Sequence, residues 1–319
     1  MSSDTLIIIV GPTASGKSRL ALFLAQRLNA EIISVDSIQV YRRLNIGTAK
    51  PDINVLKQIP HHMIDVAEPG DDFSLGHFVR SAERIIQEIW KRRKLPLLVG
   101  GTGLYLRGLL KGIFEAPARD EEIRKSLRML AEEKGIEHLH SLLHEVDPAS
   151  ARRISGHDSQ RIIRALELHR KTKKTMSELI QEKSFGQDRY ASVKVGVNTK
   201  RARLYRNIEE RVEEFYKNGL VEEVRSLLES GVDPECKAFN AVGYRETVSY
   251  LRGEIDRDKM IALVKRNTKR FAKRQMTWFR KEENIQWFFY ENDVSETSAE
   301  ILDFIKGKLR NKYLQNQKV

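Results

Sequence analysis

Residues 11–18 form the clearest candidate for a ligand-binding motif in this sequence. They read GPTASGKS, a phosphate-loop pattern, with an apolar run before them and a helical pattern after them. Glycines let such a loop wrap its backbone N–H groups around an anion, and the helix dipole, a lysine and a hydroxyl complete a site for adjacent phosphates and a metal ion. The predicted diphosphate-binding residues are Gly11, Pro12, Thr13, Ala14, Ser15, Gly16, Lys17 and Ser18, and Ser18 is the predicted metal ligand.

Two further apolar runs end in residues that could join this chemistry. Asp36 follows the run at residues 31–35, and a glycine turn at residues 100–103 follows the run at residues 95–99. Ligands of open α/β sheets bind at the carboxyl ends of strands, so these residues and the phosphate loop are expected to converge. Asp36 could be a general base, a metal ligand or a helix N-cap. The glycine turn stands where phosphate-loop nucleoside triphosphatases often have an acidic residue that organises the metal ion. Its presence there disfavours a standard ATPase or GTPase.

The elements that must position these residues follow from the apolar pattern. Short β-branched runs alternate with helical patterns, which predicts an α/β fold with a P-loop parallel-sheet core. The predicted strands are residues 6–10, 31–35, 95–99 and 192–197, and the predicted long amphipathic helices of the C-terminal half are residues 203–230 and 259–282.

Residues 116–185 lack strand signals and are rich in charged helical segments. This pattern predicts an inserted all-helical domain. Its predicted helices include residues 121–134, 136–145 and 159–170. The catalytic core is then discontinuous, made of residues 1–115 and 186–319, with its C-terminal helices packed beside the N-terminal sheet.

The overall composition indicates an intracellular protein with a polyanionic partner. Among 319 residues, 56 Lys and Arg against 44 Asp and Glu give a formal charge of +12, which favours nucleic acid but does not choose RNA over DNA or a membrane surface. One cysteine, Cys236, forms no internal disulfide and suits a reducing cytosol. No apolar run approaches the roughly 20 residues that span a bilayer. We therefore expect a cytoplasmic protein with no membrane partner.

Taken in order along the chain, the motifs resemble those of the bacterial tRNA dimethylallyltransferases, also called tRNA isopentenyltransferases. The resemblance covers nearly the whole chain, and such a series is far more specific than any one motif. The matching stretches are residues 11–18, 36–41, 46–51, 60–65, 99–105, 158–167, 242–246 and 272–280.

This resemblance implies a reaction and a set of catalytic residues. The substrates would be dimethylallyl diphosphate and a tRNA with adenosine at position 37, and the base's exocyclic 6-amino group would receive the dimethylallyl group. The family's general base matches Asp36, and Thr13 matches the loop threonine that touches the substrate end of the diphosphate. The phosphate loop, Lys17, Mg²⁺ and an arginine would stabilise the leaving diphosphate.

The sequence departs from the family pattern at residues 204–211, where the arginine that contacts the diphosphate is expected. The family often reads Leu-x-x-Arg-Ile-x-x-Arg, but Asn207 replaces the first arginine here. Arg211 keeps the second position, whereas Arg206 is out of phase by one residue, which rotates a helical side chain by about 100°. We therefore favour Arg211 as the diphosphate contact.

The resemblance also implies that the inserted domain grips the anticodon stem-loop of tRNA. We expect a monomer. In this family the target base would leave the anticodon stack and enter the active site, as happens in other enzymes that modify the edge of a base. The positions matching the family's tRNA contacts are Asp36, Ser37, Ile38, Gln39, Thr102, Arg124, Gln160, Arg161, Ile162, Ile163 and Arg164.

Three other functions remain as alternatives. A small-molecule kinase would use ATP in the same loop, but it would need an adenine site and phosphoryl-transfer apparatus that the sequence does not reveal. An adenylate prenyltransferase would modify free AMP, although such proteins generally lack a large tRNA-gripping insertion. An RNA-binding protein with a vestigial phosphate loop would not need the intact Lys17, Ser18 and Asp36.

Overall fold

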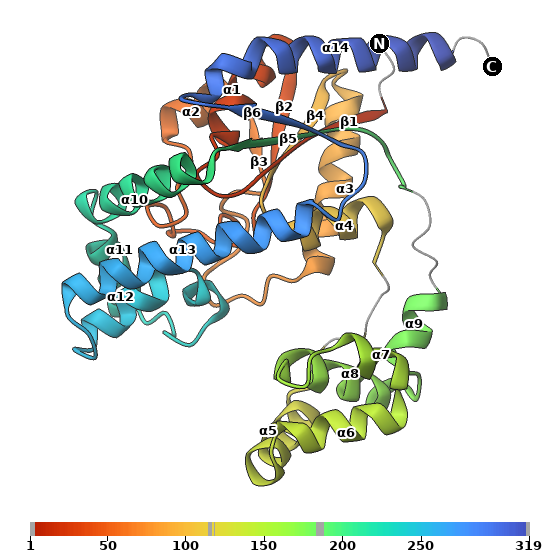
Figure 1. Ribbon diagram of the computed structural model, residues 1–319, viewed down its shortest axis with the longest axis vertical. Coiled ribbons are helices and arrows are strands. Elements are labelled where there is room, and N and C mark those ends of the chain that lie inside the picture. Colours follow the sequence, from red (N-terminus) through yellow and green to blue (C-terminus); the bar gives the residue numbers. More distant parts are fainter. Residues whose placement is uncertain (1–3, 114–116, 118, 183–187, 317–319) are drawn as a thin grey trace. The chain divides into compact units, whose positions relative to one another are not determined.

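A six-stranded sheet forms the centre of the larger of two units in the computed structural model, which describes residues 4–113, 117, 119–182 and 188–316 (Figure 1). All its strand pairs are parallel, and the strand order is β3-β2-β4-β1-β5-β6. The strands are β1 (Thr5–Val10), β2 (Ala30–Val35), β3 (His61–His62), β4 (Leu95–Gly100), β5 (Ala191–Thr199) and β6 (Ile285–Tyr290). The predicted α/β fold with a P-loop parallel sheet is confirmed.

The register of the central strands brings three loops to one edge of the sheet. Gly100 at the end of β4 pairs with Val10 at the end of β1 and with Val35 at the end of β2. The segments that follow these residues therefore leave the sheet side by side. These are the phosphate loop, the segment beginning at Asp36 and the glycine turn.

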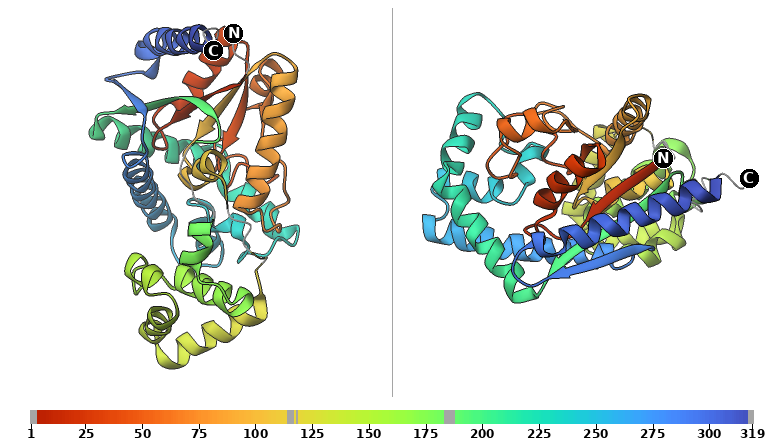
Figure 2. Two further views of the ribbon diagram at one scale, coloured as in Figure 1. Left: turned by 90° about the vertical axis from the view of Figure 1, so that its right-hand side faces the viewer. Right: turned by 90° about the horizontal axis from the view of Figure 1, so that it is seen from above.

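Helices of the larger unit cover both faces of this sheet. Their bounds are α1 (Lys17–Leu28), α2 (Ile53–Gln58), α3 (Leu75–Lys91), α4 (Gly103–Lys111), α10 (Arg201–Lys217), α11 (Leu220–Glu229), α12 (Tyr244–Leu251), α13 (Arg257–Phe279) and α14 (Ser298–Asn316), with 3₁₀ helices η1 (Lys237–Asn240) and η2 (Val294–Thr297). On one face α14 lies beside α1 and contacts β5 (Figure 2). On the other face Ile8 and Val10 lie close to Leu106 of α4 and Phe279 of α13.

Alternation along β1 explains why both faces are covered. Ile7 and Ile9 join the cluster that α1 and α14 complete, whereas Ile8 faces the opposite side. All six residues of β1 are buried. A strand buried on both faces reads as an unbroken apolar run, which is why the sequence predicted it readily.

The second unit consists of residues 111–188 and has its own apolar core. Its helices are α5 (Glu121–Lys134), α6 (Ile136–Val146), α7 (Pro148–Arg153), α8 (Ser159–Thr172) and α9 (Met176–Glu182). Leu127, Leu139, Leu143 and Ile162 are fully buried in that core. The domain boundaries expected at residues 116 and 185 fall outside the described residues.

The structure corrects the sequence prediction in two places. Residues 203–230 are not one helix, because Gly219 takes a left-handed φ of 95° and separates α10 from α11. Two strands, β3 and β6, were also missed. Strand β3 has only two residues, and β6 follows directly on the pattern of α13. Among the described residues, no helix is long and apolar enough to span a membrane.

Candidate functional site

The phosphate loop joins β1 to α1 and is closed by a backbone hydrogen bond from the N–H of Ser15 to the carbonyl oxygen of Pro12. Gly16 is the N-cap of α1 and has a φ of 76°, a left-handed conformation that glycine adopts without strain. Ser15 is fully buried, and its hydroxyl has no hydrogen-bond partner among the described residues. The loop therefore precedes a helix N-terminus, where backbone N–H groups and the dipole favour an anion.

Lys17 is the first residue of α1, is half-buried, and donates a hydrogen bond from Nζ to the carbonyl oxygen of Pro12 at 2.6 Å. Burial and, to a smaller extent, the charge of Arg211 lower the pKa of Lys17 to about 7, although the carboxylate of Asp36 opposes both effects. An ammonium so poorly stabilised in the free protein gains most when an anion arrives. The same three charged groups were predicted to serve one site.

Helix α10 lies against the phosphate loop with one side-chain face. Arg211 lies within hydrogen-bond distance of Thr13, with 3.4 Å between Nη1 and Oγ1. Asn207, one turn earlier, donates from Nδ2 to the carbonyl oxygen of Ala14 at 3.1 Å. Arg206 is exposed, whereas Arg211 is half-buried and burial lowers its pKa. The structure thus brings Arg211, and not Arg206, to the loop.

Asp36 leaves the end of β2 and caps a turn rather than a helix. Its Oδ1 accepts the N–H groups of Ile38 at 2.8 Å and Gln39 at 3.2 Å. Its Oδ2 accepts no hydrogen bond from the described residues. One oxygen therefore fixes the side chain while the other is available to a ligand. Ser37 is held separately, since its N–H donates to Oγ1 of Thr102 at 3.2 Å.

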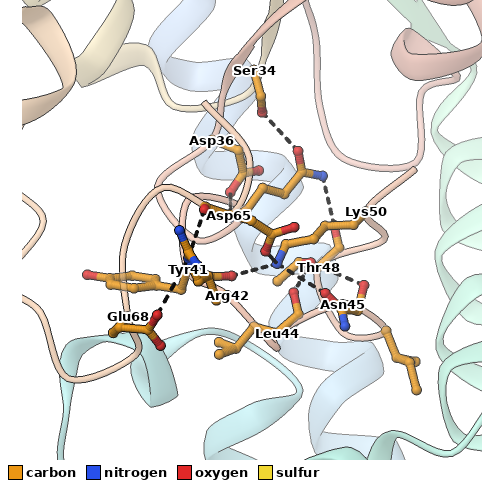
Figure 3. Close-up of polar contacts among 12 residues, drawn as sticks. Ser34, Asp36, Tyr41, Arg42, Leu44, Asn45, Thr48, Lys50, Asp65 and Glu68 are labelled. Atoms are coloured by element: carbon orange, nitrogen blue, oxygen red, sulfur yellow. Dashed lines mark hydrogen bonds and ion pairs between the residues drawn. The ribbon is translucent and has the colours of Figure 1, made fainter. Parts of the chain in front are cut away.

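Hydrogen bonds from polar side chains fasten the segment after Asp36 (Figure 3). Gln39 accepts a hydrogen bond from Ser34 at 2.8 Å and donates to the carbonyl oxygen of Thr48 at 3.0 Å. Lys50 donates to the carbonyl oxygen of Tyr41 at 2.5 Å and to Asp65 at 2.6 Å (Figure 3). The Lys50 side chain is 4% exposed, and burial lowers its pKa. These contacts stiffen the loop that carries Asp36.

Sequence reasoning missed a residue that the structure places at the phosphate loop, Gln275 of α13. Its Oε1 accepts the N–H of Thr13 at 2.7 Å, and its Nε2 donates to the carbonyl oxygen of Gly101 at 3.2 Å. Gln275 belongs to one of the stretches that carry the family resemblance. A single glutamine on a helix, however, forms no recognisable functional motif in the sequence. A buried polar residue on the apolar face of that helix was the only available signal.

The predicted tRNA contacts on α8 point in different directions. Gln160 and Arg161 are exposed, and Arg161 makes an ion pair with Asp158 at 3.4 Å. Ile162 is 0% exposed and Ile163 is 6% exposed, because both side chains lie in the core of the second unit. Only Gln160 and Arg161 therefore offer their side chains to a ligand without rearrangement.

Arg124 and Arg164 are committed to a buried carboxylate. Glu167 is 0% exposed and lies 2.9 Å from Nη1 of Arg164 and 3.4 Å from Nη1 of Arg124. Its other oxygen accepts the N–H of Asp120 at 2.7 Å. The pair of Arg124 with Glu167 thus joins α5 to α8, while Arg164 neutralises the same carboxylate from within α8.

A magnesium ion fits this loop only if the substrate supplies most of its ligands. The described residues contain no group of three His, Cys, Asp or Glu side chains that could hold a metal ion. Mg²⁺ commonly takes one or two protein oxygens and completes its shell with phosphates and waters. Ser18 is exposed in the first turn of α1, and its hydroxyl makes no hydrogen bond to the described residues. Such a hydroxyl can join phosphate oxygens around the ion.

Comparison with known families agrees with this geometry. The IPP transferase family model matches residues 39–282, and the Isopentenyl transferase model matches residues 4–66. The tRNA dimethylallyltransferase 2 of Geotalea daltonii is 45% identical over 301 residues, which cover 94% of this chain and 92% of that protein. The tRNA dimethylallyltransferase of Geobacter sulfurreducens is 44% identical over 303 residues, which cover 95% of this chain and 97% of that protein.

Solved structures give the same relationship. The tRNA isopentenylpyrophosphate transferase of Bacillus halodurans matches with a TM-score of 0.74 at 38% identity, over 98% of this chain and 99% of that one. A eukaryotic dimethylallyltransferase acting on tRNA matches with a TM-score of 0.81 at 25% identity, over 98% of this chain and 80% of that one. The resemblance read from the sequence is confirmed, and the chain belongs to the IPP transferase family together with these tRNA dimethylallyltransferases.

Proposed function

We propose that this protein transfers the dimethylallyl group of dimethylallyl diphosphate to the exocyclic 6-amino group of adenosine 37 in tRNA and releases diphosphate. The supporting observation is the placement of a phosphate loop after β1 and a carboxylate, Asp36, after β2, at the same edge of the sheet and on either side of β4, in a family member whose relatives are tRNA dimethylallyltransferases. The loop suits a leaving diphosphate, and the carboxylate suits the proton of an amino group.

Breaking the allylic carbon–oxygen bond leaves its electron pair on the diphosphate. The backbone of residues 11–18, the N-terminus of α1 and Lys17 are placed to stabilise that charge. We assign Arg211 to the same task and Thr13 to the bridging end of the diphosphate, because the two side chains lie 3.4 Å apart at the loop. Mg²⁺, held by Ser18 and phosphate oxygens, would supply further charge neutralisation when bound.

The bond that forms joins the adenine amino nitrogen to the same carbon, and the nitrogen must lose a proton. An exocyclic amino group is a weak nucleophile because its lone pair is delocalised into the ring, so a base must act during attack. We assign this role to Asp36, whose Oδ1 is fixed by two backbone N–H groups and whose Oδ2 can take the proton.

We further propose that residues 111–188 grip the anticodon stem-loop. The exposed Gln160 and Arg161 of α8 would contact it directly, while Arg124, Arg164, Ile162 and Ile163 would hold the helices that carry them. In the core, Ser37, Ile38, Gln39 and Thr102 would border the extruded base. The formal charge of +12 supports the attraction of a polyanion, and we infer a monomer that acts in the cytoplasm.

The test is incubation of the purified protein with Mg²⁺ and radiolabelled dimethylallyl diphosphate, without ATP, and with either unmodified tRNA carrying adenosine 37 or AMP. We expect label in tRNA alone. Label in AMP at a comparable rate would identify an adenylate prenyltransferase instead. Label in neither substrate would contradict the proposal and return attention to a kinase or an RNA-binding protein.

A further inference from the structure

Gln275 spans the space between two loops at the carboxyl edge of the sheet. The residue is 7% exposed, so its amide must find its partners within the protein. The phosphate loop offers a donor, the N–H of Thr13, and the glycine turn offers an acceptor, the carbonyl oxygen of Gly101. A primary amide supplies one acceptor and one donor for these two groups, whereas a carboxylate or a thioether cannot supply both.

A second tie continues from the glycine turn to the loop of Asp36. Thr102 accepts the N–H of Ser37 on its Oγ1 at 3.2 Å and donates its own N–H to the carbonyl oxygen of Val35 at 3.2 Å. In the sheet β4 lies between β1 and β2, so the glycine turn lies between the other two loops. Gln275 and Thr102 together therefore link three adjacent strand ends.

We propose that Gln275 is a positioning residue that fixes the spacing between the diphosphate-binding loop and Asp36. This inference rests on the proposed transfer reaction. The bond that breaks and the bond that forms share one carbon atom, so the groups that act on each must keep a set separation. A displacement on the order of 1 Å in such an arrangement can cost about a hundredfold in rate. Gln275 touches neither reacting bond and acts through the two loops.

Two substitutions break the same tie from opposite sides. Gln275→Met keeps the length of the side chain but removes both hydrogen bonds. Gly101→Ala leaves α13 unaltered, yet its new Cβ would lie 1.9 Å from Nε2 of Gln275 and must displace the amide. The matched controls are Gln286→Met at an exposed site on β6 and Gly307→Ala on α14, where a Cβ meets nothing within 4 Å.

We expect each substitution to lower kcat for tRNA prenylation about tenfold or more, with KM for both substrates changed by less than about threefold. Because both changes remove one interaction, the double variant should be no slower than the slower single variant. The controls should retain the kcat of the unaltered protein. An unchanged kcat in Gly101→Ala, a loss confined to KM, or additive losses in the double variant would each overturn the proposal.

Hydrogen–deuterium exchange separates this inference from the proposed function. Peptides covering residues 11–18 and 36–41 should exchange faster in both variants than in the controls, with or without activity. Faster exchange with normal kcat would overturn the positioning role. If the unaltered protein prenylates no tRNA while exchange still responds, the proposed reaction fails and Gln275 is left as a structural tie, which overturns its catalytic meaning.

Discussion

The core and the helical unit use their charged side chains in opposite ways. Around the phosphate loop, neutral side chains such as Asn207 and Gln275 satisfy the backbone, and the charged groups Lys17 and Asp36 each keep atoms available to a ligand. In the helical unit, Arg124 and Arg164, which were predicted to contact tRNA, form ion pairs with the buried Glu167 instead. A charged motif thus indicates binding only where the fold leaves the charged atoms accessible to a ligand.

The most severe test of this comparison removes the charge of Asp36 and keeps its shape. Asp36→Asn can still accept the N–H groups of Ile38 and Gln39, so the turn should persist while the base is lost. We expect the single-turnover rate to fall by about 10²- to 10⁴-fold. Filter binding of tRNA should change by less than threefold, roughly, since the carboxylate contributes no attraction to a polyanion. A normal rate would contradict the assignment of Asp36 as base, and Asp36→Ala should lose at least as much rate.

The opposite use of charge in the helical unit predicts a loss of stability rather than of chemistry. Glu167→Ala would leave Arg124 and Arg164 largely buried without their counterion. We expect the unit to lose about 3 kcal/mol of unfolding free energy. Urea unfolding, monitored by hydrogen–deuterium exchange in α5 and α8, measures this loss. The control is Glu133→Ala at an exposed site. Equal stability of the two variants would mean that the arginines are not held by Glu167.

The poised charge of Lys17 predicts a pH dependence of diphosphate binding. Its pKa of about 7 in the free protein lies below its ordinary value, so the ammonium is present below pH 7 and lost above it. A polyanion stabilises the ammonium and raises this pKa, so binding at pH 8 should take up a proton, and affinity should fall by up to about tenfold per pH unit above pH 7.

Calorimetry of pyrophosphate binding in two buffers of different ionisation enthalpy measures this proton uptake. Lys17→Arg, which stays charged throughout, corrects for the titration of pyrophosphate itself. The unaltered protein should take up more protons than this variant. Identical uptake would show that Lys17 remains protonated in the free protein, and the contrast drawn with the helical unit would weaken.

The smallest expected effect is a change in tRNA binding that distinguishes the outward-facing residues of α8 from those that face the core. Arg161→Ala removes an exposed charge and should weaken tRNA binding about fivefold, with a shallower salt dependence and unchanged stability. Ile162→Ala should instead destabilise the unit by about 2–5 kcal/mol. Filter binding across a salt series, with urea unfolding of both variants, tests the pair. Equal tRNA affinity of Arg161→Ala and the unaltered protein would exclude a direct contact by Arg161.

The sheet and the phosphate loop could be predicted because their signals are local. Strand β1 is an unbroken apolar run, and its loop pattern needs only eight consecutive residues. The edge strand β6 exposes Gln286 and Phe289, which are three residues apart, and it follows a long helix, so the sequence pattern did not separate it from that helix. The break at Gly219 was missed because the apolar stripe continues on both sides of it.

The site could be predicted only in part, for a related physical reason. Thr13 and Lys17 lie in one short segment, whereas Arg211 and Gln275 reach Thr13 from helices, 198 and 262 residues later in the chain. Their contacts depend on how α10 and α13 pack, which no short spacing encodes. On α8 the resemblance supplied five consecutive positions, but each helical step of about 100° turns the next side chain away, so the structure divides them.

The strand order has a consequence for synthesis on the ribosome. The phosphate loop is made first, yet β1 lies between β4 and β5, so one of its two neighbours emerges only after the whole helical unit. Arg211, Asn207 and Gln275, whose side chains hydrogen-bond to the loop, emerge later still. The nascent chain therefore exposes an unfinished sheet edge during translation, a state prone to wrong strand pairing. The protein can become an enzyme only after nearly all of its chain has been released.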